Sequence, residues 1–506
     1  MSHYLIGIDI GTSNIKSVLF DDQYRETYVA SQPNETIHLD DSESFAEQDM
    51  DRAWQKVCLT LKELVEKCGV AATDIKGIGV TGQGEGVWLI DPQGKPVRNA
   101  ILWCDSRAAS VVHQLEITHD KLTQITQETY NKPLPCNTTM ILSWLAQHEP
   151  QTLQKAHRLL FAKDWIRYKL TGMLGLELSD SGTSLLNLDS QTLASSIFND
   201  PELNLTDATR LMSPIHQPTD LVGTITADVA EFTGLALTTQ VCAGALDVSA
   251  AALGVGAIKD NDVFTILGTT CCTGIVTSEL EISQDDSNRT IPHALADHFM
   301  VLKATLSGTP NIEWCLDSIS QTHDFVEIEK LISQVPAGAG GIIYHPYLVG
   351  ERAPFFNENA RANFFGINRN TTREHLIKAV YEGIAYTIKD ALEGSPTEGR
   401  LFLAGGGTNS PAWSQIIADV TGRTVVIPQA KELSSKGAAI LAGIALGMTP
   451  AHQMDDIFAI DQCYSPLPQH FELYENLFEI YKTLRDVAIP LWDLRAQILE
   501  SKHLEQ

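Results

Sequence analysis

Residues 6–21 read IGIDIGTSNIKSVLFD, and this stretch decides the fold. Isoleucines alternate with glycine and aspartate at 6–11, a Gly-Thr-Ser-Asn run at 11–14 has turn chemistry, and a β-branched and aromatic run follows at 17–20. The pattern predicts a strand, a tight turn and a second strand. A Rossmann unit is disfavoured, because the chain returns to a strand after the glycine and has no G-x-G-x-x-G motif there.

Four polar residues of this hairpin suggest chemistry. Asp9 is a carboxylate within an apolar strand, and burying it without a partner is costly, so we expect it to face a cation or a cleft. Thr12, Ser13 and Lys16 surround a glycine turn whose backbone N–H groups suit a phosphate. An aspartate that only caps its own turn is the structural alternative.

A second copy of this pattern lies in the other half of the chain. Residues 263–276, VFTILGTTCCTGIV, again read as strand, Gly-Thr turn and strand. We interpret this as an internal duplication. Two such hairpins, one in each half, would converge on one polyphosphate from opposite sides.

The segments between and after the hairpins predict mixed sheets covered by helices. Helices are expected at 51–70, 142–172, 434–447 and 471–499, and a strand, loop and strand at 75–90. Residues 179–184, SDSGTS, are interpreted as a polar loop to which no chemistry is assigned.

Two polar segments of the first half are candidates for binding a polyhydroxylated ligand. In the loop TGQGEG, Gln83 and Glu85 offer oxygen acceptors beside Gly84, although a plain hairpin turn explains the same residues. Trp103 and Asp105 pair a flat apolar face with a carboxylate, which is a common way to hold a sugar. Trp103 in the core, with Asp105 in a surface ion pair with Arg107, is the alternative.

The second half adds two further candidates. Asp247 begins a helix of small residues, where it acts either in catalysis or as a capping residue. Residues 401–410, LFLAGGGTNS, read as a buried strand that ends in glycines, and close backbone approach to a nucleotide would explain three of them. A tight strand-to-helix turn would explain one or two.

Composition excludes several classes of function. The chain has 506 residues and a net charge of -27, which disfavours nucleic acid or an anionic membrane as its partner. The opening residues MSHYLIGIDI lack a basic region and a long apolar region, so we expect a cytoplasmic protein. Nine cysteines without C-x-x-C spacing predict reduced, buried thiols, and the adjacent pair Cys271-Cys272 cannot make a zinc site by itself.

The motif set as a whole resembles the FGGY carbohydrate kinases, within the superfamily of sugar kinases, Hsp70 and actin. Residues 362–382, ANFFGINRNTTREHLIKAVYE, fit the second signature of that family. Residues 347–357, YLVGERAPFFN, and 402–413, FLAGGGTNSPAW, are also similar to it. The resemblance runs from about residue 4 to about residue 450.

The resemblance implies an α/β fold of two duplicated ribonuclease-H-like (actin-like ATPase) domains, residues 1–244 and 245–506, with a cleft between them. It implies ATP and Mg²⁺, with Asp9 as the magnesium-associated aspartate and Asp247 as the general base. The other contacts that it implies are Thr12, Ser13, Gly268 and Thr269 for the phosphates; Gly406, Gly407 and Asn409 for adenosine; and Gln83, Gly84, Glu85, Trp103 and Asp105 for the sugar.

The sequence departs from the family in two places. The first signature, near residues 135–149, has Ile141 where the family has lysine. The adenine-side motif reads SGTPNIEW, with Pro310 and Asn311 instead of two glycines, and Asn311 is kept as a candidate nucleotide contact. The GQGEG loop is closer to the L-xylulose and erythritol kinase branches than to D-xylulose or glycerol kinases, and Gly84 is expected to leave space where those related kinases have a Met or Arg side chain.

We therefore expect an ATP-dependent kinase for a small neutral sugar, a pentulose such as L-xylulose or a polyol such as erythritol. D-xylulose or glycerol is the alternative substrate. A conformational ATPase or a sugar sensor without phosphoryl transfer is the competing class, and a homodimer is possible. Such proteins would need neither Asp247 nor the pair of Trp103 and Asp105, whose joint presence favours a kinase.

Overall fold

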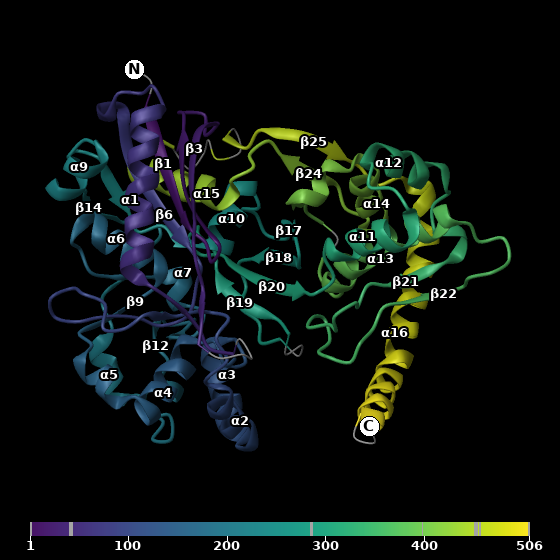
Figure 1. The fold of residues 1–506 in the computed structure, drawn as a ribbon, viewed down its shortest axis with the longest axis horizontal. Helices are drawn as coiled ribbons and strands as arrows, with labels where there is room; N and C mark the ends of the chain where they lie inside the picture. The colour runs from purple at the N-terminus through teal and green to yellow at the C-terminus, as the bar shows by residue number, and fades with distance from the viewer. Residues whose placement is uncertain are drawn as a thin grey trace.

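The computed structural model contains two seven-stranded sheets, one in each half of the chain (Figure 1). It describes residues 3–39, 44–283, 287–396, 398–449, 454 and 457–503. Both sheets mix parallel and antiparallel strands and have helices on their faces, which confirms the predicted α/β class.

The first sheet is built around the N-terminal hairpin. β1 pairs antiparallel with β2, as the alternation of residues 6–20 predicts, and it pairs parallel with β6. Its strands are ordered β14 (Leu221–Thr224), β15 (Gln240–Cys242), β6 (Ile75–Gly82), β1 (Tyr4–Ile10), β2 (Asn14–Phe20) and β3 (Glu26–Pro33), with β16 (Ala245–Leu246) also on β6.

The second sheet repeats this arrangement. β17 pairs antiparallel with β18 and parallel with β23, as β1 does with β2 and β6. The outer pairs also correspond: β24 pairs antiparallel with β25 as β15 does with β14. The duplication is therefore confirmed, and the order is β25 (Ile460–Tyr464), β24 (Val425–Pro428), β23 (Leu401–Ala404), β17 (Val263–Leu267), β18 (Cys271–Thr277), β20 (Phe299–Thr305) and β19 (Arg289–Pro292).

Two helices of small residues lie between the two sheets and pack on them (Figure 1). α15 (Leu433–Ala445) lies on the first sheet, where a Cβ on Gly7 or Gly79 would be 1.8 Å from a carbonyl oxygen of that helix. α10 (Asp247–Val255) packs Ala252 and Val255 in one cluster with aromatic residues of the second sheet. The two helices cross at Gly254 and Gly437, where backbones touch.

Longer helices cover the outer face of the first sheet, and a group of shorter elements follows. The helix expected at 142–172 is interrupted, because the short strand β9 (Arg158–Leu160) pairs with β7 (Trp88–Ile90). The helices are α1 (Met50–Lys67), α2 (Ala109–Ile117), α3 (His119–Thr129), α4 (Thr138–His148), α5 (Pro150–Lys155), α6 (Ala162–Thr171), α7 (Leu178–Ser181), α8 (Ser195–Phe198) and α9 (Ala227–Thr233). The short strands are β4 (Ile37–His38), β5 (Ala46–Gln48), β8 (Ala100–Ile101), β10 (Leu176–Glu177), β11 (Leu186–Asn187), β12 (Thr192–Leu193) and β13 (Ile215–His216).

The second half has its own helical cover and a long C-terminal helix. α16 begins slightly before and ends slightly after the expected bounds, and its Tyr474, Tyr481 and Trp492 belong to the core of this half. The elements are α11 (Pro310–Cys315), α12 (Phe325–Gln334), α13 (Arg373–Ala391), α14 (Pro411–Thr421), α16 (Pro468–His503) and the short strands β21 (Ile343–His345) and β22 (Asn363–Phe365).

Within the described residues, no helix is both long and apolar enough to cross a bilayer. All nine cysteines are free thiols, but only four of them are buried as expected, and Cys104 and Cys463 are exposed.

Candidate active site

Two carboxylates from different elements interact beside the first hairpin. Asp9 lies on β1 opposite Lys16, and Asp247 is the first residue of α10. Burial and the charge of Asp247 raise the pKa of Asp9 to about 7. Burial likewise raises the pKa of Asp247 to about 6, although the N–H of Val248 and the charge of Lys163 oppose this increase. The site therefore holds two carboxylates whose charge is poorly compensated.

This pair suits a magnesium ion that is bound together with a phosphate. Asp9 Oδ1 is buried and accepts no hydrogen bond within the described chain. No group of three or more metal-ligating side chains forms a metal site by itself in the part of the chain that is described. Mg²⁺ commonly binds one or two carboxylates and takes its other ligands from water and substrate phosphates. The arrangement around Asp9 fits such an ion.

The first turn links the predicted phosphate residues to the predicted sugar residues. Thr12 Oγ1 donates to Gln83 Oε1 and accepts from Trp103 Nε1, both at 3.0 Å. Ser13 is exposed. Lys16 Nζ lies 2.7 Å from Glu432, at the start of α15, so its amine already has a carboxylate partner from the second half.

The second turn is supported from behind by a glycine. Gly268 and Thr269 lie between β17 and β18, and Thr269 is exposed. Thr309 donates to the carbonyl oxygen of Gly268 through both its N–H, at 2.8 Å, and its hydroxyl, at 3.0 Å. A Cβ on Gly308 would be 2.3 Å from that same oxygen. Only glycine at 308 allows this close contact.

The residues predicted for adenosine have different surroundings. Gly406 is exposed and has open space beside it, whereas a Cβ on Gly407 would be 2.7 Å from Trp413. Asn409 is exposed, and its amide donates to the carbonyl oxygen of Gly406. Asn311 is buried, and its Oδ1 accepts from the hydroxyl of Tyr344 at 2.8 Å. Its side-chain oxygen is thus used inside the protein.

In the loop at residues 83–85, the structure differs from two expectations based on the sequence. The space expected beside Gly84 is filled, because a Cβ there would be 2.0 Å from Leu246 Cδ1. Glu85 is not a free acceptor, since Asn137, Thr138 and Ser184 donate to its carboxylate at 2.6–3.0 Å. Both features depend on residues far away in sequence, which the local pattern could not reveal.

The sugar-binding interpretation of this segment fits Trp103, whereas the ion-pair interpretation fits Asp105. Trp103 is 44% exposed, so it is available to a ligand and is not a core residue. Asp105 is 1% exposed, and its carboxylate accepts from the N–H of Ala46 and from the guanidinium of Arg107. The expected hydroxyl contact of Asp105 therefore conflicts with a buried ion pair that already occupies both oxygens.

Sequence patterns of one family match almost the whole chain. The pattern for the N-terminal domain of the FGGY family of carbohydrate kinases matches residues 4–254, and that for the C-terminal domain matches residues 263–446. The chain belongs to this family. It is an ATP-dependent sugar kinase and therefore a phosphotransferase.

Named relatives of this FGGY kinase act on xylulose and related sugars. It is 30% identical over 501 residues to a probable L-xylulose kinase of Pasteurella multocida, covering 95% of this chain and 98% of that one. It is 30% identical over 458 residues to the L-xylulose/3-keto-L-gulonate kinase of Escherichia coli, covering 88% and 89%. The crystal structure of xylulose kinase from Rhodospirillum rubrum is 25% identical, with a TM-score of 0.86 over 97% of this chain and 100% of that one.

A buried cluster of charged residues beside the candidate site of this FGGY kinase was not predicted from the sequence. Residues 179–184, expected as a polar loop, begin within α7 and are buried. Charged side chains of α6 meet Asp180 of this segment and Glu177, the last residue of β10: the cluster is Lys163, Asp164, Arg167, Glu177 and Asp180. The signal in the sequence was the presence of four charged residues in a helix that also carries Trp165 and Ile166.

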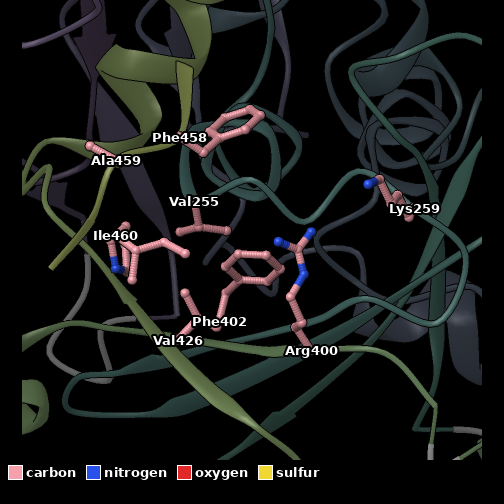
Figure 2. A pocket seen from close by; sticks show the side chains of 9 residues that line it. Val255, Lys259, Arg400, Phe402, Val426, Phe458, Ala459 and Ile460 are labelled. Carbon is pink, nitrogen blue, oxygen red and sulfur yellow. The ribbon is translucent and has the colours of Figure 1, made fainter. Parts of the chain in front are cut away.

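A cavity lies away from these residues. It has a volume of 170 Å³ and lies between the end of α10 and the strands β23 and β24 (Figure 2). In Figure 2, Arg400 extends beside the ring of Phe402, and its guanidinium carbon is 4.6 Å from the ring centre. No residue predicted to bind ATP or sugar lines this cavity.

Proposed function

We propose that this FGGY kinase transfers the γ-phosphoryl group of ATP to a hydroxyl of a small neutral sugar, either a pentulose such as L-xylulose or a polyol such as erythritol. The observation that carries the proposal is the position of Asp247. Its carboxylate lies at the start of α10, interacts with Asp9, and belongs to a helix that packs between the two sheets.

Asp247 is suited to accept the proton of the attacking hydroxyl. A general base works best when its pKa is near the operating pH, and the pKa of Asp247 is raised to about 6. At neutral pH it is therefore mostly ionised, yet basic enough to take a proton. Such a base contributes about 10²–10⁴-fold to the rate.

The remaining groups would position the triphosphate. Bound Mg²⁺ neutralises charge on the phosphates during transfer. Asp9 would hold that ion through its unpartnered oxygen. The exposed residues Ser13 and Thr269 would contact phosphates from the two turns, and Lys16 would share its charge between Glu432 and a phosphate. Alignment of this kind contributes about 7–11 kcal/mol.

The sugar would bind beside Trp103 and Gln83. Trp103 presents an exposed apolar face, and Gln83 is held by hydrogen bonds from Thr12 and to Gln48. Glu85 would shape the loop through its internal hydrogen bonds, and its negative charge still disfavours a sugar acid nearby. One relative is named for 3-keto-L-gulonate, so a sugar acid is the alternative to test beside D-xylulose and glycerol.

The test is a substrate screen with purified protein, ATP and Mg²⁺. We expect ADP release to depend on sugar and to be fastest with L-xylulose or erythritol, with a phosphorylated sugar visible by mass spectrometry. A preference for D-xylulose, glycerol or a sugar acid would refute the proposed substrate. ADP release without any phosphorylated sugar would instead indicate a conformational ATPase or sensor.

The homodimer stays a prediction. Analytical ultracentrifugation at the concentrations used in the assay would decide it.

A further inference from the structure

A fully buried ionic cluster lies behind the proposed sugar site. Lys163 Nζ, on α6, lies 2.7 Å from Asp180, 3.4 Å from Glu177 and 3.6 Å from Asp164. All four side chains are 0% exposed. Arg167 adds a second buried cation 3.0 Å from Asp164. The phosphoryl-transfer chemistry proposed above uses none of these residues directly.

One arm of the cluster ends on the sugar loop. Asp180 Oδ1 accepts the backbone N–H of Glu85 at 2.9 Å, while its other oxygen binds Lys163. Glu85 has a φ of 57°, in the left-handed region that costs free energy for a residue other than glycine. A hydrogen bond to a buried carboxylate is one contact that holds this strained residue in place.

The other arm ends on the residue before the proposed base. Glu177 accepts the hydroxyl of Ser179 at 2.7 Å, and Ser179 Oγ accepts the backbone N–H of Leu246 at 2.8 Å. Leu246 directly precedes Asp247, and the side chain of Leu246 also fills the space beside Gly84. The two arms thus join the sugar loop and the start of α10 through one cluster.

Stability alone is a weak reason for such a cluster. Desolvating several charges costs free energy that their mutual attraction often only balances, and apolar residues of similar volume are often as stable. The charges here are connected to two backbone N–H groups of the site. Resting on the proposed function, we propose that Lys163, Glu177, Ser179 and Asp180 are positioning residues that fix the sugar loop relative to Asp247.

The test uses two small substitutions and a matched control. Ser179→Ala removes the acceptor for Leu246, and Asp180→Asn removes the charge that binds Lys163 and orients Glu85. Ser181→Ala is the control, because Ser181 lies on the same short helix and its buried hydroxyl has no hydrogen-bond partner within the described chain.

We expect the two substitutions to affect the sugar and not the nucleotide. Ser179→Ala should lower kcat/KM for the sugar about tenfold and Asp180→Asn about a hundredfold, with KM for ATP within about twofold of wild type. Ser181→Ala should stay within about twofold for both substrates. Wild-type sugar kinetics in both Ser179→Ala and Asp180→Asn would overturn the proposal, as would equal losses for sugar and ATP.

Amide hydrogen exchange gives a readout that does not need catalysis. Peptides that contain Leu246 should exchange faster in Ser179→Ala, and peptides that contain Glu85 should exchange faster in Asp180→Asn, with Ser181→Ala like wild type. Unchanged exchange in both segments would also overturn the proposal. If wild-type protein phosphorylates no sugar, the proposed function fails, while the exchange measurement still decides whether the cluster holds these segments.

Discussion

The two hairpins of this duplicated kinase share a backbone plan but differ in their side chains. In the first hairpin, the pair one step before the turn is Asp9 opposite Lys16. In the second hairpin, the corresponding pair is Ile266 opposite Cys272. The carboxylate that is proposed to hold Mg²⁺ is therefore present in the first hairpin only, and the second hairpin has the Gly-Thr turn without it.

The two turns are also supported differently. The first is tied through Thr12 to Gln83 and Trp103, so it is coupled to the proposed sugar site. The second is backed by Gly308 and Thr309, which lead into α11 on the nucleotide side. We therefore propose that both turns contact the phosphates and that only the first is also coupled to sugar binding.

The largest effect should come from Asp247, which follows the first sheet and begins the helix between the halves. Asp247→Asn should lower sugar-dependent turnover by about 10²–10⁴-fold, because the general base is lost. ATP binding, followed by thermal shift, should change little. Turnover above about a tenth of wild type would contradict the base role.

A substitution behind the second turn should affect the binding of ATP and not that of the sugar. Gly308→Ala would place a Cβ 2.3 Å from Gly268 O and 2.4 Å from Thr269 O, so the backbone of the turn must shift. We expect KM for ATP to rise about tenfold, since misplacing a positioning group by a fraction of an ångström is costly. An equal rise in KM for the sugar would show that the two turns are not divided as described.

The matched pair Thr12→Val and Thr269→Val compares the turns directly. Thr12→Val removes the hydroxyl that binds Gln83 and Trp103, and should raise KM for the sugar about 3–10-fold, as expected for lost hydrogen bonds. Thr269→Val should leave KM for the sugar unchanged and weaken only the binding of ATP. Steady-state kinetics with each substrate varied would reveal the reverse pattern if the assignment is wrong.

The smallest effect should be on stability. The pKa of Asp9 is raised to about 7 in the folded protein. Ionisation of Asp9 therefore lowers the free energy of unfolding as the pH rises from about 4 to about 7. The melting temperature of ligand-free Asp9→Asn should therefore exceed that of wild type by roughly 2–4 °C at pH 8. This difference in melting temperature should be smaller at pH 5.

Cys272→Ser is the control in the second hairpin for the Asp9 prediction. The pKa of its thiol is raised to about 11, so its charge does not change between pH 5 and pH 8. A gain for Asp9→Asn that is larger at pH 5 than at pH 8 would contradict the burial of a charged Asp9.

The hairpins and the duplication could be predicted because their signals are local. Alternating apolar residues and a Gly-Thr turn specify a strand pair within about 15 residues of sequence. The short strand Arg158–Leu160 could not be predicted in this way, since its pairing with Trp88–Ile90 depends on a distant segment.

The sequence predicted the residue types of the candidate site better than it predicted the contacts of those residues. The charge of Asp247 reaches Asp9 and raises its pKa, and the roles that the resemblance implies for these two residues stay predictions. The burial of residues 179–184 was missed, because polar residues enter a core only when distant partners such as Lys163 compensate them. Glu85 and Asp105 were expected to face the sugar, but local sequence could not show that internal donors already occupy them.

The exchanged positions of α10 and α15 limit the independence of the two halves. α10 follows the first sheet in sequence, yet its residues pack in the apolar clusters of both sheets, and α15 follows strands of the second sheet yet packs on the first. A chain cut after α10 would give two fragments, each with a sheet that lacks a helix from its partner. Although the sequence is a tandem repeat, we therefore expect neither half to fold fully when it is expressed alone.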